Sequence, residues 1–321
     1  MESKWEMYQD APEGFFPFTA IMKPAENFVD QFKKTGSGFQ FPVIAKPAIG
    51  SKGQGVAVIK DVYALQQYHH TCSVDYLVQQ KIDYPMEAGI FYVCLPGEAK
   101  GIITGIVEKE FIQVTGNGQD SIETLLLQNP RYLLQVKSLR QILLPEIMNE
   151  VLPNGDRKIL LDIGNHARGA YFINASHRIN DLLTATINNV CTKFPGFYYG
   201  RLDIRFNSWE QLSHGNEFAV IELNGSGSEP THIYDPANSI THAWQEICRH
   251  WHLMYVISRH NHKKKGIAYL SFKKGIQLLQ SHVNYNKKLQ LLAKDAYEDR
   301  QESITMIHDL KLNTTGQKYA G

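Results

Sequence analysis

The chain has 321 residues, more than one hydrophobic core usually serves, so we expect two or three lobes. Its hydrophobic fraction of 43% is ordinary, no run approaches the ~20 apolar residues of a membrane span, and the N-terminus lacks the features of a signal peptide. Four scattered cysteines without a CxxC pair indicate reduced cytosolic thiols, not a disulfide framework or a zinc site. The net charge is +1, although 13 Lys/Arg accompany only 5 Asp/Glu from Arg249 onward. We interpret this basic tail as a solvated helical face and expect no nucleic-acid partner.

A glycine-rich hairpin is predicted early in the chain. Two helices precede it, over residues 3–9 and 25–32. The run Val43–Ala45 predicts a strand that ends at Lys46, and Gly50, Gly53 and Gly55 separate it from a second strand. Glycines let the backbone turn tightly, so that N–H groups can converge on an anion. The Walker sequence GxxxxGK[ST] is absent. An ordinary flexible hairpin is the alternative interpretation.

Strands and short helices alternate through the middle of the chain. Strands are predicted over residues 75–83, 88–95, 101–107, 111–114 and 158–163. Helices are predicted over residues 62–68, 129–149 and 178–194, and another begins with Asp120 or Ser121 as its N-cap. The strand over residues 75–83 leaves one lobe and enters the next, and ligands often bind at such a hinge. We place Glu108, Lys109 and Glu110 between two strands.

Two apolar runs near the end of this region carry acidic or amide residues at alternate positions. Asp203 lies in the run 200–207, and Glu222 and Asn224 lie in the run 218–228. Because strand side chains alternate between faces, Glu222 and Asn224 share a face, which Asp203 can join if the runs pair as a hairpin. Three hard oxygen ligands on rigid strands fit Mg²⁺. The alternative interpretation is a hairpin whose polar residues lie on its solvent-exposed face.

The order of these motifs resembles the ATP-grasp superfamily of carboxylate–amine ligases. That superfamily includes D-alanine–D-alanine ligase, bifunctional bacterial glutathione synthetases and cyanophycin synthetase. The matching stretches are residues 42–47 with 50–56, 78–87, 114–122, 164–169, 200–204 and 221–224. They lie between Lys4 and about Pro236, and residues from about 241 onward fall outside the resemblance.

The resemblance implies an α+β ATP-grasp fold in which two α+β lobes clasp ATP. We divide the chain into a small lobe with the glycine loop (1–83), a large lobe with the metal site (84–240) and a helical C-terminal extension (241–321). Most members carry a further lobe before the position of Lys4, and here we expect that lobe to be absent, removed or supplied by another chain. The expected assembly is a homodimer or a complex with a partner chain that supplies the lobe.

Residue roles follow from the resemblance. The residues implied to bind ATP are Lys4, Lys46, Gly50, Ser51, Gly53, Gly55, Gln79, Gln80, Lys81, Ile82 and Glu87. The two early lysines would hold phosphates, the glycine loop would close over them, residues 79–82 would read adenine, and Glu87 would reach the ribose.

The resemblance also implies a metal and substrate side. Asp203, Glu222 and Asn224 match magnesium ligands for two Mg²⁺ ions, with Mn²⁺ as the alternative metal. Arg201 matches the arginine that faces the transferred phosphate. Asn165 and Arg168 are the remaining catalytic candidates, on the substrate side.

The implied function is an ATP-dependent ligase that joins a carboxylate to an amine through an acyl phosphate, releasing ADP and phosphate. The carboxylate is expected to belong to an amino acid or peptide. Two alternatives stay open, an ATP-binding regulatory or scaffold module and an ATP-grasp kinase. We expect a cytoplasmic protein with small-molecule substrates and no membrane partner.

The last part of the chain predicts two helices. Trp244, Ile247, Trp251, Met254 and Tyr255 recur at helical spacing, so we expect an apolar face that docks on the lobes. A second helix over residues 267–294 would carry the basic charge. The pairs His250-x-His252 and His260-x-His262 resemble metal pairs, but residues i and i+2 of a helix point apart, so we expect core or surface histidines.

Overall fold

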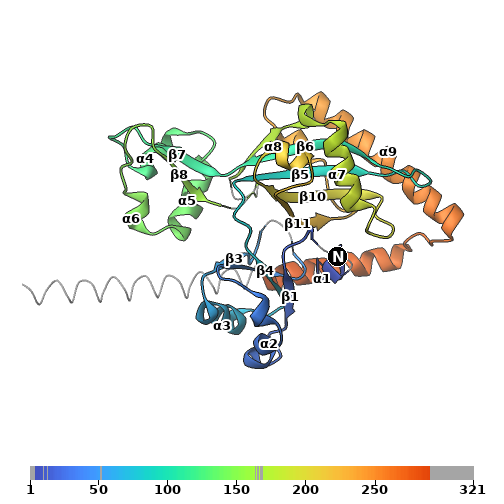
Figure 1. The fold of residues 1–321 in the computed structure, drawn as a ribbon, viewed down its shortest axis with the longest axis horizontal. Helices are drawn as coiled ribbons and strands as arrows, with labels where there is room; N and C mark the ends of the chain where they lie inside the picture. The colour runs from blue at the N-terminus through green and yellow to red at the C-terminus, as the bar shows by residue number, and fades with distance from the viewer. Residues whose placement is uncertain are drawn as a thin grey trace, which may run out of the picture. The chain divides into compact units, whose positions relative to one another are not determined.

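The computed structural model describes residues 4–9, 11–12, 14–50, 53–162, 164, 166 and 169–289 (Figure 1). These residues form two compact units. Unit 1 holds residues 20–79 and the helical residues 272–289, and unit 2 holds residues 4–19 and 80–271. Residues 241–271 fall in unit 2 and residues 272–289 in unit 1. The division into a small lobe, a large lobe and a C-terminal extension stays a prediction. Both units mix helices and sheets, which confirms the predicted α+β class.

Unit 1 is built on a four-stranded sheet in the order β1-β4-β2-β3. Its strands are β1 (Thr19–Met22), β2 (Val43–Pro47), β3 (Ala57–Ile59) and β4 (Tyr76–Gln80), and its helices are α2 (Phe28–Thr35), η1 (Gly36–Gly38) and α3 (Val62–Thr71). Strands β2 and β3 pair antiparallel, so the predicted hairpin is confirmed. Leu289 of the helical segment 272–289 is buried in the same core as Val43 and Tyr76.

Unit 2 is built on a five-stranded sheet in the order β11-β10-β5-β6-β9. The strands are β5 (Met86–Val93), β6 (Ile102–Glu110), β9 (Tyr171–Asn174), β10 (Tyr199–Phe206) and β11 (Phe218–Asn224). The helices with it are α1 (Lys4–Gln9), η3 (Ser176–Arg178), α7 (Asp181–Cys191), α8 (Trp209–Ser213), η4 (Thr231–Tyr234) and α9 (Ile240–Lys265). One face of the sheet packs apolar side chains against α7 and α8 around Ile90, Leu202 and Ile187.

A smaller layer of unit 2 has its own core. It consists of the two-stranded sheet of β7 (Ile112–Thr115) and β8 (Arg157–Leu161) with helices α4 (Ile122–Gln128), α5 (Leu133–Ile142) and α6 (Pro145–Met148). The region predicted as a helix over residues 129–149 contains α5 and α6 and contributes buried residues, among them Val136 and Leu139.

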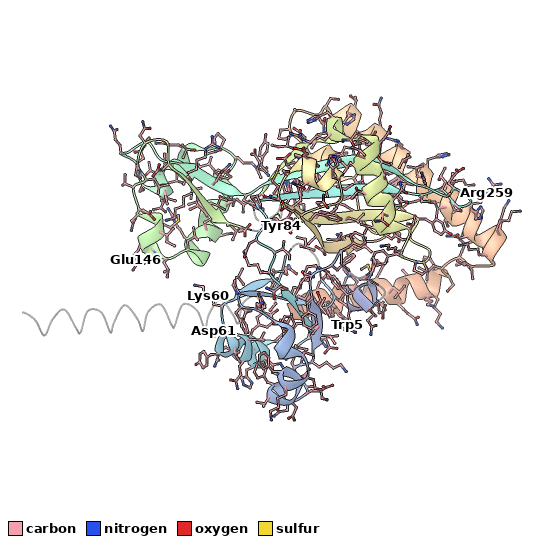
Figure 2. All side chains as sticks on the ribbon, viewed as in Figure 1. Trp5, Lys60, Asp61, Tyr84, Glu146 and Arg259 are labelled. Atoms are coloured by element: carbon pink, nitrogen blue, oxygen red, sulfur yellow. The ribbon has the colours of Figure 1, made fainter. Side chains whose placement is uncertain are left out.

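Side-chain caps explain where most of the longer helices begin. An oxygen of the residue before α2, α3, α4, α7, α8 and α9 accepts a hydrogen bond from the N–H three residues later. Asp61, labelled in Figure 2, caps α3 in this way, and Ser121 caps α4 as predicted. Such a cap satisfies a backbone donor that has no partner within the helix.

The predicted docking face of α9 is partly wrong. His250 and Ile257 are buried against the sheet, whereas Trp244, Trp251 and Tyr255 are exposed. The docked face is polar in part, because the Tyr199 hydroxyl oxygen and His250 Nδ1 form a hydrogen bond of 3.1 Å. The sheet thus supplies partners for a polar helix face, and the tryptophans turn outward.

Gly105 in the middle of β6 is required by a close approach. A Cβ placed on Gly105 would lie 2.2 Å from two ring atoms of His232, in η4. We expect Gly105→Ala to displace that ring and to lower the free energy of unfolding by about 1–3 kcal/mol. Urea denaturation measures the change. Gly227→Ala is the control, since a Cβ at Gly227 would meet nothing within 4 Å; an equal loss in both variants would contradict the prediction.

The buried histidines under α9 predict a pH dependence of stability. Burial lowers the pKa of His250 from 6.5 to about 4 and also lowers that of His232, although Glu246 opposes both shifts, while His242 and Arg249 lower that of His232 further. Between pH 6.5 and about 4 the unfolded chain therefore binds more protons than the folded one. The contribution of these histidines to the unfolding free energy is fully present above pH 6.5 and falls as the pH drops toward 4.

Urea denaturation at neutral and mildly acidic pH tests this dependence. In His250→Gln the fall in unfolding free energy with acidification should be smaller than in the wild type, because one titrating group is gone. An identical fall in both proteins would count against His250 as a source of the pH dependence.

Candidate functional site

The strand register brings four predicted residues onto one face of the unit 2 sheet. Asp203 pairs with Glu222 and Arg201 pairs with Asn224 across the antiparallel strands β10 and β11. Residues directly opposite each other share a face of the sheet. The predicted hairpin is therefore confirmed, and its polar residues lie opposite the face that packs around Leu202 and Ile204.

Buried ion pairs connect this face to the neighbouring strands. Lys109 of β6 lies 2.9 Å from a Glu87 oxygen and 3.2 Å from an Asp203 oxygen. Arg201 donates from Nε to Asp203 at 2.8 Å, and Arg205 donates from Nε to Glu87 at 2.9 Å. Glu87, Lys109 and Asp203 are each at most 6% exposed. Three adjacent strands thus contribute alternating charges to one network.

The network keeps its members charged despite burial. Burial alone would raise the pKa of Asp203, but Arg201 and Lys109 hold it at about 2. Burial alone would lower the pKa of Lys109, but Asp203 and Glu87 raise it. Opposite charges within hydrogen-bond distance favour the ionised forms. The face therefore presents fixed charges at neutral pH.

The N-terminal helix α1 reaches the same face. Lys4 Nζ lies 2.6 Å from an oxygen of Glu222, and Tyr8 donates a hydrogen bond from its hydroxyl to the Ile221 carbonyl at 2.5 Å. Lys4 was predicted to contact a phosphate and Glu222 a metal. In this structure the two side chains neutralise each other, so a ligand at either one would compete with the ion pair.

The donor set of this face fits Mg²⁺. Asp203 and Glu222 offer carboxylate oxygens and Asn224 an amide oxygen, the hard ligands that Mg²⁺ prefers. The Asn224 amide nitrogen is buried without a hydrogen-bond partner among the described residues. Over the same residues, no three His, Cys, Asp or Glu side chains are arranged to hold a metal, and the assignment of Asp203, Glu222 and Asn224 as metal ligands stays a prediction.

In unit 1, Lys46 is buried at the end of β2 and donates a hydrogen bond to Gln79 Oε1 at 2.9 Å. Gly53 and Gly55 have positive φ, as a tight turn requires, and the Tyr68 hydroxyl donates to the Gly55 carbonyl at 2.7 Å. Gly50 precedes this turn, and Ser51 lies outside the described residues.

The remaining predicted residues have varied environments. The backbone N–H of Gln80 donates to the Phe18 carbonyl at 2.8 Å, and Ile82 follows in a segment without regular structure. Lys81 pairs with Asp83. Asn165 and Arg168 lie outside the described residues.

Glu87 was predicted to reach a ribose. Its carboxylate is buried and bonded by Lys109 and Arg205, so in this structure both oxygens serve the ion network. The ribose role stays a prediction, as do the other ligand assignments.

Sequence reasoning missed Lys109 and Arg205. The loop predicted around Lys109 is wrong, because β6 continues through Glu110. Within β6, Lys109 and Val107 lie on the same face. The alternation of side chains along the strand could therefore have indicated that Lys109 continues the strand. Three consecutive charged residues concealed it. Arg205 likewise continues the alternation of Arg201 and Asp203 along β10.

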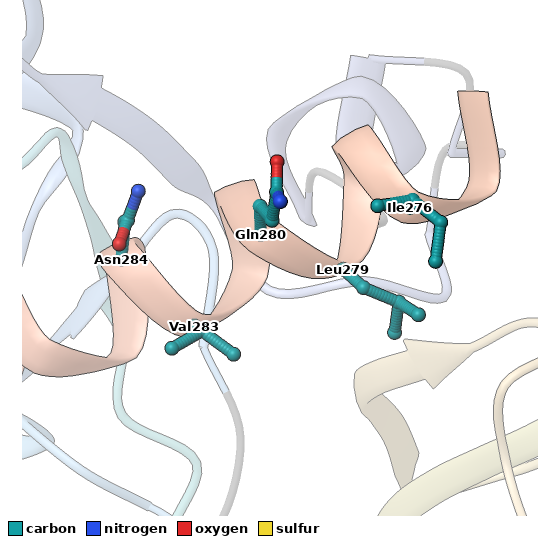
Figure 3. Close-up of a pocket in the computed structure, with 5 residues that line it drawn as sticks. All are labelled: Ile276, Leu279, Gln280, Val283 and Asn284. Carbon is teal, nitrogen blue, oxygen red and sulfur yellow. The ribbon is translucent and has the colours of Figure 1, made fainter. Parts of the chain in front are cut away.

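The pocket shown in Figure 3 involves none of these residues. Ile276, Leu279, Gln280, Val283 and Asn284 of the helical segment 272–289 line it. None of these five residues is charged.

No protein-family model and no curated protein sequence matches the chain. Among solved structures it is similar to a bifunctional glutathione synthetase from Pasteurella multocida, at 13% identity and a TM-score of 0.40 over 77% of this chain and 34% of that one. It is also similar to a D-alanine–D-alanine ligase from Bacillus anthracis, at 12% identity and a TM-score of 0.42 over 80% and 65%.

A third similar structure is an ADP complex of N5-carboxyaminoimidazole ribonucleotide synthetase, at 9% identity and a TM-score of 0.43 over 76% and 50%. The chain spans 34% to 65% of the length of these three proteins.

Lys109 should be a strong determinant of stability. Lys109→Met leaves the Glu87 and Asp203 carboxylates buried beside each other without their shared cation, so we expect the unfolding free energy to fall by about 3–5 kcal/mol. Lys158→Met is the control, because Lys158 pairs with Glu150 at the surface and should cost less than about 1 kcal/mol. Similar losses in both variants would show that the network does not depend on Lys109.

Proposed function

We propose that the chain is an ATP-grasp ligase that joins a carboxylate to an amine at the expense of ATP. The observation that carries the proposal is the register of β10 and β11, which places Arg201, Asp203, Glu222 and Asn224 on one sheet face. These are the residues for which the sequence resemblance implies roles toward magnesium and the reacting phosphate.

The chemistry needs positive charge that is fixed in advance. A carboxylate that attacks a phosphate meets like charge on the phosphate oxygens, so catalysis depends on neutralisation and positioning more than on covalent chemistry. Asp203 holds Arg201 through Nε at 2.8 Å and through a terminal nitrogen at 3.3 Å. A guanidinium fixed at two points has little orientation left to lose when substrate binds.

Bound Mg²⁺ would neutralise phosphate charge, with Asp203, Glu222 and Asn224 as its protein ligands. Asp203 Oδ2 already has Lys109 and the Arg201 terminal nitrogen as donors, whereas Oδ1 accepts from Arg201 Nε and has a second lone pair for a cation. Glu222 would hold the metal in place of its ion pair with Lys4, and the Lys4 ammonium group would then be available to a phosphate oxygen.

Arg201 has a second role in the proposed reaction. The amine attacks an acyl phosphate through a tetrahedral intermediate, and the Arg201 guanidinium would stabilise the oxyanion of that intermediate.

Lys46 of unit 1 would hold phosphates of ATP, as the resemblance implies. We propose an amino acid or peptide as the acid substrate and the cytoplasm as the location.

Phosphate release by the purified chain with ATP, Mg²⁺ and pooled amino acids tests the proposal, with mass spectrometry of the products. An amide product together with ADP and phosphate supports a ligase. Tight ATP binding without turnover would indicate the scaffold alternative, and a phosphorylated acceptor without an amide would indicate a kinase. Either result overturns the ligase assignment.

Glu222→Gln should reduce turnover by about 100-fold or more, because an amide is a poor substitute for a carboxylate that binds a metal. The loss of the Lys4 ion pair should change stability little, since that pair is partly exposed. Steady-state phosphate release and thermal unfolding measure the two effects. Glu210→Gln, at an exposed position of α8, is the control; an unchanged rate in Glu222→Gln would remove the metal assignment.

A further inference from the structure

Helix α9 carries a strip of exposed apolar side chains along one side. Ile240, Trp244, Trp251 and Tyr255 are 77%, 62%, 64% and 58% exposed. Their spacings of four, seven and four residues place them on one face of the helix. This face, termed the α9 strip, is distinct from the face that buries His250 and Ile257.

The strip continues beyond the end of the helix. Gly266 ends α9 in a left-handed conformation, and Ile267, Tyr269 and Leu270 follow with 54%, 58% and 60% exposure. The ring of His262 stacks on Tyr269 at 4.0 Å between centroids. This contact holds the following segment against the last turn of α9, so unit 2 alone carries both parts of the apolar surface.

The charges beside the strip are almost all positive. Glu246 is the only acidic residue between Ile240 and Leu289, and Arg249 lies 3.4 Å from it. The basic residues gather at the C-terminal end of α9, where Arg259, labelled in Figure 2, precedes Lys263, Lys264 and Lys265. Lys265 contacts the Tyr198 hydroxyl at 2.5 Å, and Lys263 and Lys264 are exposed cations of the same last turn of α9.

We propose that the α9 strip docks unit 2 onto the surface of an anionic lipid bilayer, with the helix lying in the interface. Tryptophan and tyrosine side chains prefer the level of the lipid headgroups, and an apolar face flanked by lysine and arginine is typical of interfacial helices. Basic residues near an anionic surface add electrostatic attraction. Within the described chain no helix has the length and apolarity needed to cross a bilayer.

Other occupants fit the charges less well. A second copy of the chain, paired in parallel, would bring the same cations against each other, and an antiparallel pairing would leave them without a counter-charge. A nucleic acid would need cations along the strip, yet Arg249 is the one lysine or arginine from Ile240 to Ser258 and it is paired with Glu246. The proposal revises the expectation of no membrane partner and is independent of the proposed ligase activity.

Co-sedimentation of the full chain with vesicles tests the proposal. We compare phosphatidylcholine vesicles with vesicles that also contain about 30% phosphatidylglycerol. The wild type should bind the anionic vesicles, with a blue shift of tryptophan fluorescence and with weaker binding at high salt. The double variant W244Q/W251Q should bind with an affinity reduced by about tenfold or more. The variant K263Q/K264Q should lose affinity for the anionic vesicles.

Tyr63→Gln is the matched control, because Tyr63 is 71% exposed on α3 and lies outside the strip. Thermal unfolding of each variant verifies that the exposed substitutions leave the fold intact. No binding by the wild type, or binding that survives W244Q/W251Q, overturns the proposal. Loss of a dimer or of RNA binding in W244Q/W251Q, without vesicle binding by the wild type, overturns it as well and identifies the other occupant.

Discussion

The polar face of unit 2 depends on the two ion pairs that the ammonium group of Lys109 makes. It lies between the carboxylates of Glu87 and Asp203, which would repel each other in a buried environment without it. Arg201 and Arg205 contact the same two carboxylates from β10. Since an unpaired buried charge is costly, the charges on β5, β6 and β10 fix one another in place. The face is therefore arranged before any ligand binds.

The sequence was sufficient to predict that Glu222 and Asn224 share a face, because alternation along a strand needs only the period of two. The place of Asp203 on that face depended on the two runs pairing as a hairpin, which the structure shows. The sequence could not predict which residues stand opposite each other, since a bulge between Asp203 and Ile204 shifts the register. Lys109 was missed because three charged residues in a row indicate a loop unless buried partners compensate them. Glu87 lies 22 residues from Lys109 in the chain and Asp203 lies on a still more distant strand, so no local pattern contains these partners.

Helix α9 shows a different limit of pattern analysis. Apolar spacing identified Trp244, Trp251 and Tyr255 as one face, but spacing alone does not distinguish a face that packs from a face that is exposed. The buried face contains His250 and Glu246, which sequence composition would assign to solvent. Tyr199 and His232 on the sheet side make this burial favourable by supplying polar partners.

The N-terminal segment has a consequence for association between molecules. Strand β11 is an edge of the five-stranded sheet, and an open edge is a template for pairing with another chain. Phe15 accepts a hydrogen bond from the Val220 N–H at 2.8 Å, and Tyr8 bonds the Ile221 carbonyl. These contacts occupy backbone groups along the edge that holds Glu222. The N-terminal segment, whose Lys4 neutralises this carboxylate, thereby also hinders edge-to-edge pairing of the sheet with another chain.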